Sequence, residues 1–519
     1  MNPLAKLFTG FRARGGVHPE GRKDLSAEPP IRLLPMPPLL FVPLHQHVGA
    51  PARLSVLVGD TVLKGQLLGA SGGNISAPVH APTSGKVVAI GDFPSPHPSG
   101  LPTATVTIEP DGRDQWIETN VPDDPFSLSP EEISARVGAA GIVGLGGATF
   151  PSAVKLNLSR KSGISTLIIN GGECEPYLTC DDRLMRERAD GIVEGIRLIA
   201  YAAGASEMLV GIEDNKPEAI AAMRRAAVGT AVEIKVVPAM YPMGWDKQMI
   251  QVLTGKEVPA EGRSAEIGVL VHNVATAWAV YQAIRFGRPL VSRVVTVSGA
   301  AVTAPGNLEV PIGALASDLI NACGGLLVDP QRLVLGGPMM GTQLPHLNVP
   351  MVKGSSGLLA LTSKEIGLPQ PAPCIRCSTC VRACPVGLLP LEMAAHIRAA
   401  DLSSAVGLGL KDCIGCGSCS YVCPAHIPLV HFFNYAKGEL AAQEKAKLRT
   451  EATRKLADAR NERMQRIVHE REEAARLRTE KKAAADAAKK AAAEAANVAA
   501  KQAAAEVAMH AAAKQEELA

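Results

Sequence analysis

The sequence predicts a protein of several domains in which α and β structure are mixed. Its 519 residues exceed the usual size of one domain, and 47% of them are hydrophobic, so most of the chain can build cores. Short strands broken by glycine and proline give way to strands that alternate with helices. Eight of the 11 cysteines then gather in one late window. We expect five regions, with the bounds 1–130, 131–288, 289–345, 365–436 and 437–519.

Composition narrows the classes of partner. The net charge of +3 is too weak to indicate a polyanion, and 3% aromatic residues leave few rings on which bases could stack. We therefore expect no nucleic-acid partner. The first 16 residues lack an apolar core and a cleavage site, and no stretch offers about 18 uninterrupted apolar residues. The sequence thus predicts no signal peptide and no membrane-spanning segment. We expect the protein to reside in a reducing compartment.

The first region combines an extended arm, 1–30, with a small β barrel-sandwich over 40–95. Its short alternating strands are separated by glycine and proline turns. The phrases within 59–68 and 77–88 resemble biotinyl- and lipoyl-type modules, which carry a modified lysine in the hairpin between them. Here that hairpin, 71–74, reads Ser-Gly-Gly-Asn. We therefore expect a structural role for this region.

The second region has the rhythm of a parallel sheet. Strands are expected at 165–170, 208–212 and 233–237, and helices at 191–203 and 216–227. This alternation predicts a Rossmann-like α/β domain. Ligands of such sheets bind at the carboxyl ends of the strands.

A glycine-rich loop precedes the first strand of this domain. It contains Gly144, Gly146, Gly147 and, one turn into the following helix, Lys155. Glycines let backbone N–H groups approach a phosphate, and the helix N-terminus near Pro151 favours negative charge. The spacing departs from G-x-G-x-x-G because Thr149 occupies the last position. An ordinary tight turn is the open alternative.

A polar turn follows the strand 165–170. Asn170, Glu173 and Glu175 suit a ribose, the edge of an isoalloxazine or a nicotinamide amide, and a solvated turn is equally compatible. Cys174 and Cys180 are spaced too far apart for CxxC chemistry, so we expect ordinary core thiols.

The third and fifth regions are predicted from pattern alone. Strands near 294–300 and 305–310 and a helix at 315–322 resemble a soluble-ligand-binding β-grasp (SLBB-like) module, which we take as a structural spacer. After Gly438 the chain has neither glycine nor proline and is dominated by Ala, Lys, Glu and Arg. High helix propensity with a weak apolar stripe predicts a long solvated helix or a disordered tail. Contact with a partner helix or a membrane surface stays open.

The fourth region contains two copies of the spacing C-x2-C-x2-C-x3-C-P. In two-cluster ferredoxins the fourth cysteine of each motif ligates the other cluster. A zinc ribbon needs only paired CxxC units, and a disulfide framework suits short secreted chains. We therefore expect a helical ferredoxin-like domain with two [4Fe–4S] clusters, in which each fourth cysteine starts a helix. An apolar shell of Ile375, Val381, Ile414 and Val422 should shield the sulfurs. The expected ligands are Cys374, Cys377, Cys380 and Cys423 for one cluster, and Cys413, Cys416, Cys419 and Cys384 for the other.

Taken together, the motifs resemble the RnfC family, the C subunits of the Rnf (also called Rsx) electron-transport complexes, over nearly the whole chain. The resemblance is carried by 15–19, 144–151, 170–181, 241–247, 336–339 and both cysteine motifs. Residues 135–340 are similar to the flavin- and NADH-binding subunit of respiratory complex I.

The resemblance implies roles for individual residues. It implies that FMN is held non-covalently by Gly144, Gly146, Gly147, Lys155 and Asn170, with Tyr241, Asn273 and Thr276 closing the site. It also implies that Phe150 stacks on the nicotinamide nucleotide and that Glu175 and Asp246 bind its polar groups. Two positions depart from the complex I pattern: an acid is replaced by Trp245 and another by Ala275. A bulky Trp245 would narrow the nucleotide pocket.

The implied activity is that of an NADH-dependent oxidoreductase, a subunit of a translocase complex. Electrons would pass between NAD(H) and membrane partners through FMN and both clusters, coupled to ion translocation. The implied partners are the Rnf-type A, B, D, E and G subunits, and the implied location is peripheral, on the cytoplasmic side of a bacterial inner membrane. Two alternatives stay open: an electron relay without a functional flavin site, and a soluble flavin–iron–sulfur module of a dehydrogenase or hydrogenase.

Overall fold

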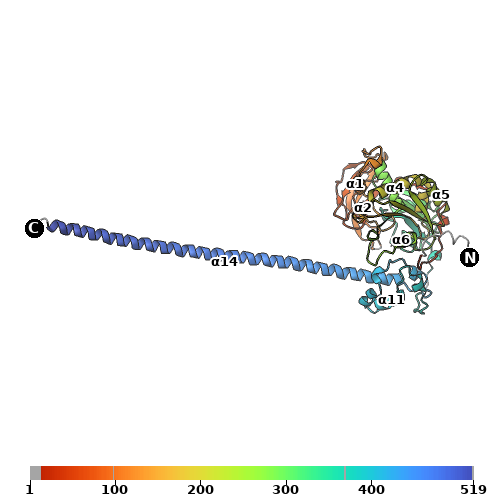
Figure 1. The fold of residues 1–519 in the computed structure, drawn as a ribbon. Helices are drawn as coiled ribbons and strands as arrows, with labels where there is room; N and C mark the ends of the chain where they lie inside the picture. The colour runs from red at the N-terminus through yellow and green to blue at the C-terminus, as the bar shows by residue number, and fades with distance from the viewer. Residues whose placement is uncertain (1–12, 98, 368–369, 517–519) are drawn as a thin grey trace. The chain divides into compact units, whose positions relative to one another are not determined.

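The computed structural model describes residues 13–97, 99–367 and 370–516 (Figure 1). It divides into two compact units, Met1–Lys437 and Gly438–Ala519. Residues 1–12 of the predicted arm lie outside the described residues. The first unit contains every predicted site residue, and the second contains most of one long helix.

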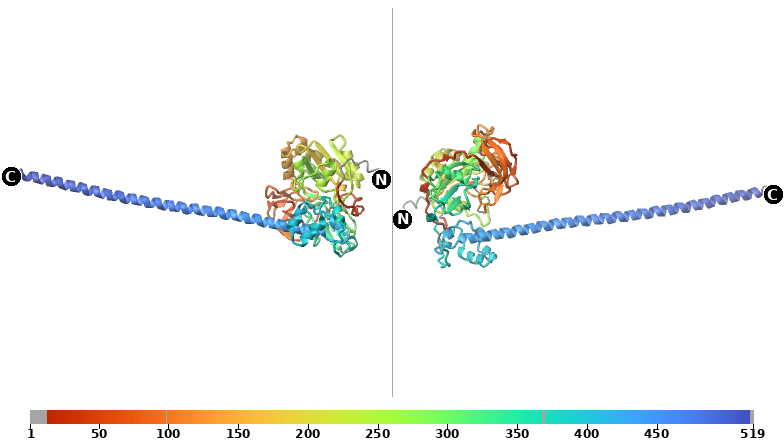
Figure 2. Two further views of the ribbon diagram at one scale, coloured as in Figure 1. Left: turned by 60° about the horizontal axis from the view of Figure 1, so that its bottom comes forward. Right: turned by 180° about the vertical axis from the view of Figure 1, so that it is seen from behind.

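Two antiparallel sheets confirm the predicted barrel-sandwich, whose strands are orange in Figure 2. Buried side chains such as Val42, Leu68 and Val87 fill the space between the sheets. The hairpin 71–74 connects two strands of the smaller sheet. One sheet contains β2 (Leu40–Pro43), β8 (Pro102–Pro110), β7 (Gly85–Pro94) and β4 (Thr61–Val62), and the other β3 (Arg53–Leu54), β5 (Leu67–Ala70) and β6 (Val79–His80).

The predicted α/β domain is built on a parallel four-stranded sheet of order β11-β10-β9-β12. Because successive side chains of a strand point to opposite faces, both faces of β9 are apolar. Leu167 and Ile169 belong to the core cluster that includes α4 and α7, and Ile168 belongs to the cluster that includes α6. The strands are β9 (Thr166–Gly171), β10 (Glu207–Glu213), β11 (Val232–Val237) and β12 (Val269–Asn273). These helices are α4 (Ala189–Ala203), α6 (Asp246–Thr254) and α7 (Val274–Phe286).

Local signals explain where the other helices of this domain begin. Ser129 and Glu132 form a capping box at the start of α1 (Pro130–Ala139). Pro217 occupies the first turn of α5 (Pro217–Ala226), where its missing N–H costs nothing. The glycine-rich loop leads into α2 (Ser152–Lys161), and the polar turn leads into α3 (Cys180–Glu187).

A mixed six-stranded sheet of order β1-β14-β13-β17-β15-β16 contains the β-grasp module. It takes in β17 and β1 from outside the predicted range 289–345, and β1 pairs in parallel with β14. The segment that directly follows the arm is therefore part of this sheet. The elements are β1 (Arg32–Leu33), β13 (Ser292–Ser298), β14 (Gly306–Pro311), β15 (Arg332–Leu335), β16 (Thr342–Leu344), β17 (Gly357–Leu361) and α8 (Ala316–Ala322).

Short helices and loops make up the cysteine-rich region. The prediction that each fourth cysteine starts a helix is wrong: α10 (Thr379–Ala383) ends before Cys384, and α13 (Ser418–Tyr421) ends before Cys423. Pro385 and Pro424 explain this, because a proline disfavours helical backbone in the residue before it. The other helices are α9 (Ser363–Ile366), α11 (Pro390–Arg398) and α12 (Leu402–Gly407).

The last element is α14 (Leu429–Glu516), so the tail is helical rather than disordered. Leu429, Phe433 and Ala436 of its first turns are buried in the first unit. In the second unit almost every described side chain is exposed, as the weak apolar stripe predicts. No helix of the described residues is long and apolar enough to cross a membrane.

Candidate functional site

The glycine-rich loop crosses the carboxyl edge of the parallel sheet at β12. The Leu145 amide donates to Thr276 Oγ1 at 3.0 Å, and Gly146 lies so close to Asn273 that an added Cβ would be 3.2 Å from the Asn273 Cβ. Gly147 has a φ of +110° in open space, a conformation that favours glycine. The stretch Gly146–Ala148 is exposed, so its backbone lies where a ligand can reach it.

Helix α2 starts immediately after this loop. The Ser152 hydroxyl in its first turn is buried and has no hydrogen-bond partner among the residues that the structure describes. The free N–H groups of a helix N-terminus favour an anion. The loop and the start of α2 therefore have the chemistry of a phosphate site.

Lys155 lies one turn further along α2. Its ammonium group donates to the backbone carbonyl of Val271 on β12. Burial lowers the pKa of this ammonium, and the carboxylate of Asp246 acts in the opposite direction. The structure therefore places the predicted phosphate ligand behind the loop, anchored to the sheet.

Two asparagines end neighbouring strands. Asn170 of β9 and Asn273 of β12 are register partners, so both side chains belong to the same edge of the sheet. Asn273 Nδ2 donates to Asp181 Oδ2 at 2.6 Å, and Asn170 Nδ2 donates to the Gly244 carbonyl at 2.7 Å. These bonds join the polar turn and the loop before α6 at the edge where the glycine-rich loop crosses.

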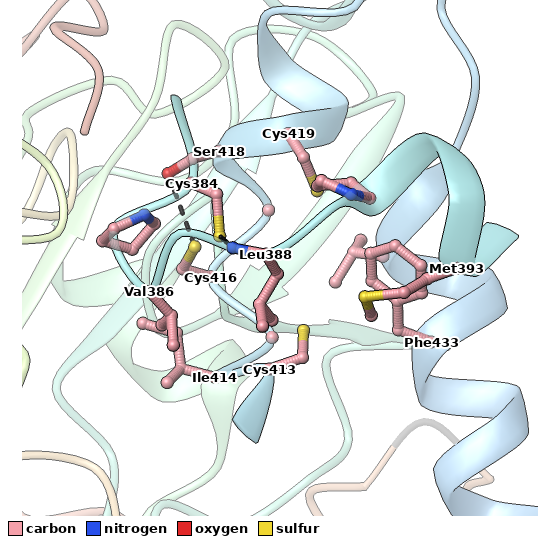
Figure 3. Close-up of a pocket in the computed structure, with 15 residues that line it drawn as sticks. Cys384, Val386, Leu388, Met393, Cys413, Ile414, Cys416, Ser418, Cys419 and Phe433 are labelled. Carbon is pink, nitrogen blue, oxygen red and sulfur yellow. Dashed lines mark hydrogen bonds between the residues drawn. The ribbon is translucent and has the colours of Figure 1, made fainter. Parts of the chain in front are cut away.

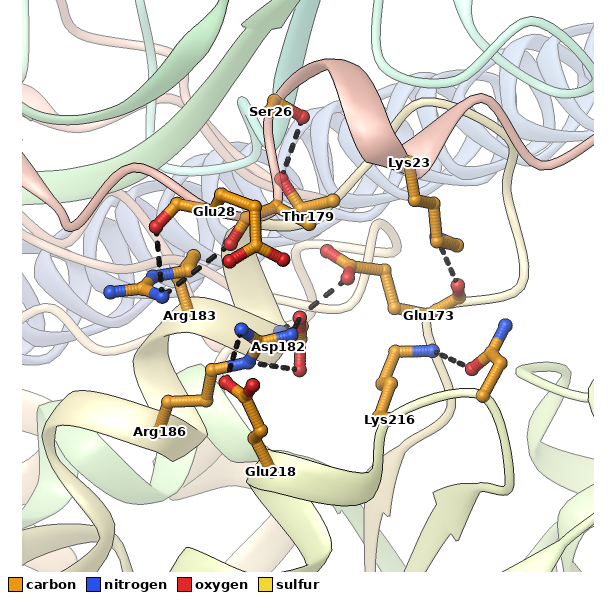
Figure 4. A network of polar contacts seen from close by, with 12 residues as sticks. Lys23, Ser26, Glu28, Glu173, Thr179, Asp182, Arg183, Arg186, Lys216 and Glu218 are labelled. Atoms are coloured by element: carbon orange, nitrogen blue, oxygen red, sulfur yellow. Dashed lines mark hydrogen bonds and ion pairs between the residues drawn. The ribbon is translucent and has the colours of Figure 1, made fainter.

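Glu173 is buried inside the polar turn. Its Oε1 accepts a hydrogen bond from the Asp181 amide at 2.9 Å, so it caps α3. Burial raises the pKa of this carboxyl, against the attraction of the nearby Lys23 ammonium. Lys23 Nζ donates to the Glu173 carbonyl at 2.9 Å (Figure 4). It also donates to the carbonyls of Glu175 and Leu178 at 3.0 and 2.5 Å. The arm thus fixes the backbone of the turn.

The two acids predicted to bind the nucleotide lie in different surroundings. Glu175 accepts hydrogen bonds from the amides of Met339 and Met340 at 2.9 and 2.8 Å, and burial raises the pKa of this carboxyl to about 7. Asp246 is exposed in the first turn of α6, directly after Trp245. Glu175 is therefore engaged with the β-grasp module, whereas Asp246 faces solvent.

The two predicted aromatic contacts also differ. Phe150 is half-buried, and its carbonyl accepts from the Gly144 amide at 2.8 Å, which closes the glycine-rich loop. Tyr241 is fully buried, and its hydroxyl donates to the carbonyl of Cys416 at 2.6 Å. Tyr241 therefore reaches from the α/β domain into the cysteine-rich region.

Four thiols surround a cavity that we call cavity 1 (Figure 3). Leu388, Met393, Ile414 and Phe433 contribute apolar walls to it. A second cavity, cavity 2, is lined by the other four thiols. The structure thus groups each fourth cysteine with the opposite motif. Cavity 1 has Cys384, Cys413, Cys416 and Cys419, and cavity 2 has Cys374, Cys377, Cys380 and Cys423.

The two cavities differ in exposure. Cys416 and Cys419 of cavity 1 are buried, and burial raises the pKa of the Cys419 thiol to about 12. Cys374 and Cys377 of cavity 2 are exposed, and a hydrogen bond from the Thr379 hydroxyl lowers the pKa of Cys377. The predicted shielding by Ile375 is wrong, since that side chain is 69% exposed on an open loop.

The donor set of each cavity fits an iron–sulfur cluster. Within the described ranges, no group of His, Cys, Asp or Glu side chains converges as a site for a single metal ion. Thiols spaced around a cavity are instead the arrangement that a multi-iron cluster requires, with one thiolate for each iron. A cluster binds thiolates, so iron must displace the thiol protons. The free energy of cluster binding would therefore offset the cost of deprotonating thiols whose pKa is raised by burial.

Two polar features in and beside the α/β domain, an arginine and an ion pair, were not predicted from the sequence. Buried Arg293 of β13 donates to the Leu145 carbonyl of the glycine-rich loop at 3.3 Å. Lys216 and Glu213 form a fully buried ion pair with an Nζ–Oε2 distance of 2.5 Å. An arginine within an apolar strand was the available signal for Arg293. No local pattern marks the buried pair, because its burial comes from packing.

The chain matches four domain families. It matches the RnfC barrel sandwich hybrid domain over residues 11–113 and the Nuo51 FMN-binding domain over 137–282. It also matches the SLBB domain over 294–343 and the 4Fe-4S dicluster domain over 373–427. These matches confirm the predicted fold class and the two kinds of cofactor, FMN and a pair of [4Fe–4S] clusters.

Several curated proteins are similar to most of the chain. The C subunit of an ion-translocating oxidoreductase complex from Rhodobacter capsulatus is 52% identical over 86% of each chain. Proteins of the same description from Salmonella arizonae and Haemophilus influenzae are each 44% identical, over 91% and 87% of this chain and 71% and 68% of theirs. A chain of an NAD+-reducing [NiFe]-hydrogenase is 20% identical with a TM-score of 0.44, over 63% of this chain and 64% of that one, too distant a likeness to bear on function.

Proposed function

Because this chain belongs to the family of RnfC-type subunits of ion-translocating oxidoreductase complexes, we propose that it exchanges electrons between NAD(H) and partner subunits of such a complex. FMN in the α/β domain and the clusters of cavities 1 and 2 would be its redox groups. The observation that carries the proposal is the pair of four-thiol cavities in one compact unit with the FMN-binding domain.

We propose that the glycine-rich loop and the N-terminus of α2 bind the FMN phosphate. The exposed backbone of Gly146 and Gly147 supports this assignment, as does the Ser152 hydroxyl, which is unpartnered among the described residues. Lys155 contributes positive charge from behind the loop. Asn170, Asn273 and Thr276 hold the surrounding loops in place through their hydrogen bonds. Bound FMN supplies hydride exchange with nicotinamide and single-electron exchange with the clusters.

The nicotinamide nucleotide would bind over the open side of the same loop. Phe150 offers a half-buried ring there, and Asp246 is an exposed carboxylate. Glu175 remains a predicted contact, but its carboxylate already accepts two backbone amides. Its role would therefore be to hold the turn 336–340 beside the site.

The exposed thiols of cavity 2 support a path outward to partners. We propose that Cys374, Cys377, Cys380 and Cys423 ligate the cluster from which electrons reach the Rnf-type A, B, D, E and G subunits. The chain would act peripherally at the cytoplasmic side of the bacterial inner membrane, where the complex couples electron flow to ion translocation.

An anaerobic cofactor assay tests the proposal. We expect about one FMN and about eight irons for each purified chain, with bleaching of the flavin and cluster absorption on titration with NADH. About eight irons without flavin and without an NADH response would contradict it and leave an electron relay, with the glycine-rich loop reduced to a turn.

Replacing Lys155 with glutamate tests the phosphate assignment. A carboxylate at that position repels the phosphate and removes the ammonium, so FMN affinity is expected to fall by roughly tenfold or more. Fluorescence titration of flavin-depleted protein measures this. Lys235→Glu, an exposed change in the same domain, is the control and should leave affinity unchanged. Equal affinity in both variants would mean that the loop does not bind the phosphate.

A further inference from the structure

A buried apolar junction joins the α/β domain to the walls of cavity 1. The arm, the α/β domain and both cysteine motifs contribute to it, so separate parts of the chain meet there. Its buried members are Val17, Tyr241, Ala383 and Cys416, with Cys174, Met339, Ile414 and Val422 packed against them.

Tyr241 is the largest side chain of this junction. It is 2% exposed and lies between β11 and α6, at the carboxyl edge of the sheet where ligands of such folds bind. Its hydroxyl donates to the backbone carbonyl of Cys416, whose own thiol lines cavity 1. One hydrogen bond therefore links the flavin domain directly to a proposed cluster ligand.

The arm forms a second link beside it. The Val17 amide donates to the Tyr241 carbonyl at 2.8 Å, and the Tyr241 amide donates to the Val17 carbonyl at 2.9 Å. The neighbouring Gly16 amide donates to the carbonyl of Ala383 at 3.0 Å. Ala383 directly precedes Cys384, the cavity 1 thiol from the other motif. We call Gly15–Val17 the strap, because it bonds to both sides of the junction.

The strap favours glycine at its first two positions. Gly15 has a φ of +61°, and a Cβ there would be 2.5 Å from the Cys384 carbonyl oxygen. Gly16 has a φ of +89°, and its Cβ would be 2.6 Å from Met240 Sδ. The positive φ favours glycine at both positions, and at Gly15 the contact with backbone also excludes a side chain. The strap and the Cys384 loop therefore lie as close as a bare backbone allows.

We propose that Tyr241 and the strap are positioning elements for electron exchange between FMN and the cavity 1 cluster. They hold Cys416 and Cys384, one ligand from each motif, against the α/β domain, and the Tyr241 hydroxyl adjusts the potential of that cluster. The inference rests on the proposed function and adds to it the element that fixes the distance between the two redox groups. In this role NADH would give a hydride to bound FMN and leave as NAD+, the two electrons would pass singly to the cavity 1 cluster, and the proton would be released to water.

The physical reason is distance and dipole together. Electron exchange slows steeply as the distance between two redox groups grows. A tightly packed junction keeps that distance short, and the exchange therefore stays fast. Hydrogen bonds and burial around a cluster also set its reduction potential. The Tyr241 O–H dipole presents its positive end to the Cys416 loop, which stabilises the more negative, reduced cluster. Removal of this hydroxyl should therefore lower the potential of the cavity 1 cluster alone.

Tyr241→Phe in the full chain, purified anaerobically within its complex, tests the role. We expect unchanged FMN and iron, a lower potential for one cluster in an EPR redox titration, and an unchanged potential for the other. Cluster reduction by NADH should slow, because a lower cluster potential reduces the driving force for electron exchange. Tyr201→Phe, a change on the exposed face of α4, is the matched control and should alter none of these quantities.

A strap variant gives an independent measurement. Gly15→Ala should increase hydrogen exchange at residues 239–241 and 414–418 together, because the two sides of the junction separate. Gly229→Ala is its control: Gly229 also has a positive φ, +75°, but a Cβ there meets no described atom within 4 Å. It carries the same backbone strain without the contact.

The outcomes separate this inference from the proposed function. Wild-type protein without flavin or without an NADH response would overturn both. Wild-type protein with both cofactors and a Tyr241→Phe variant of unchanged potentials and rate would overturn the positioning role alone. Loss of iron or a shift of both cluster potentials in that variant would equally overturn it, since a general structural role produces those effects.

Discussion

Replacing Cys384 with serine is expected to remove about four of about eight irons, and the lost cluster should be that of the second cysteine motif. Cys384 belongs to the first motif by sequence, but its thiol lines cavity 1 with Cys413, Cys416 and Cys419. Serine is a poor ligand for iron, and the remaining buried thiols then face an apolar cavity with raised pKa values. NADH-driven reduction of the other cluster should fail as well, since cavity 1 adjoins the α/β domain.

Comparison of the EPR spectra of three variants tests which of the two clusters Cys384 ligates. The EPR spectrum of Cys384→Ser should match that of Cys416→Ser and differ from that of Cys377→Ser, a cavity 2 variant. Cys180→Ser is the control, because that thiol is buried in the α/β domain, outside both cavities. A spectrum shared by Cys384→Ser and Cys377→Ser would contradict the exchange of fourth ligands between motifs.

Replacing Lys216 with methionine is expected to destabilise the α/β domain by about 3–5 kcal/mol. Burial lowers the pKa of the Lys216 ammonium, but the carboxylates of Glu213 and Glu173 outweigh it and raise the pKa overall. Since the folded-state pKa lies above 10.5, the stabilisation is fully present at neutral pH and is lost only as the pH rises through the folded-state pKa. Without this ammonium, the buried Glu213 carboxylate loses its partner.

Thermal unfolding provides the measurement. The melting temperature of Lys216→Met should fall by roughly 10 °C. A Lys216→Met, Glu213→Gln double variant should recover much of this loss, because it leaves no unpaired buried charge. Lys235→Met is the matched control: its pair with Glu233 has the same 2.5 Å distance but is 46% and 61% exposed, so solvent screens it. Equal losses in both single variants would show that burial of the pair is unimportant.

The sequence by itself determined the chemistry of the cluster region and the class of the flavin domain. The doubled cysteine spacing is local, because thiols three residues apart on one loop reach one cluster whatever the rest of the fold does. Three strands of the α/β domain, β9, β10 and β11, were equally predictable, since apolar runs such as that of β9 alternate with helical patterns, whereas β12 was not predicted. Asn170 could be placed at the carboxyl edge of the sheet because it ends a predicted strand, whereas Asn273 was named only through the family resemblance.

The tertiary structure alone decided what the remaining polar groups contact. Glu175 and Tyr241 belong to motifs that the resemblance assigns to the flavin and nucleotide site. In the structure, Glu175 accepts a hydrogen bond from the Met339 amide, and Tyr241 donates one to the Cys416 carbonyl. Lys155 bonds the carbonyl of Val271, more than a hundred positions along the chain. Periodicity and spacing report a residue's neighbours within a few positions, whereas these contacts depend on how whole domains pack. The strap is the clearest case: its glycines look like a flexible arm in the sequence, and only the structure shows their positive φ and the approach of the Cys384 backbone to Gly15.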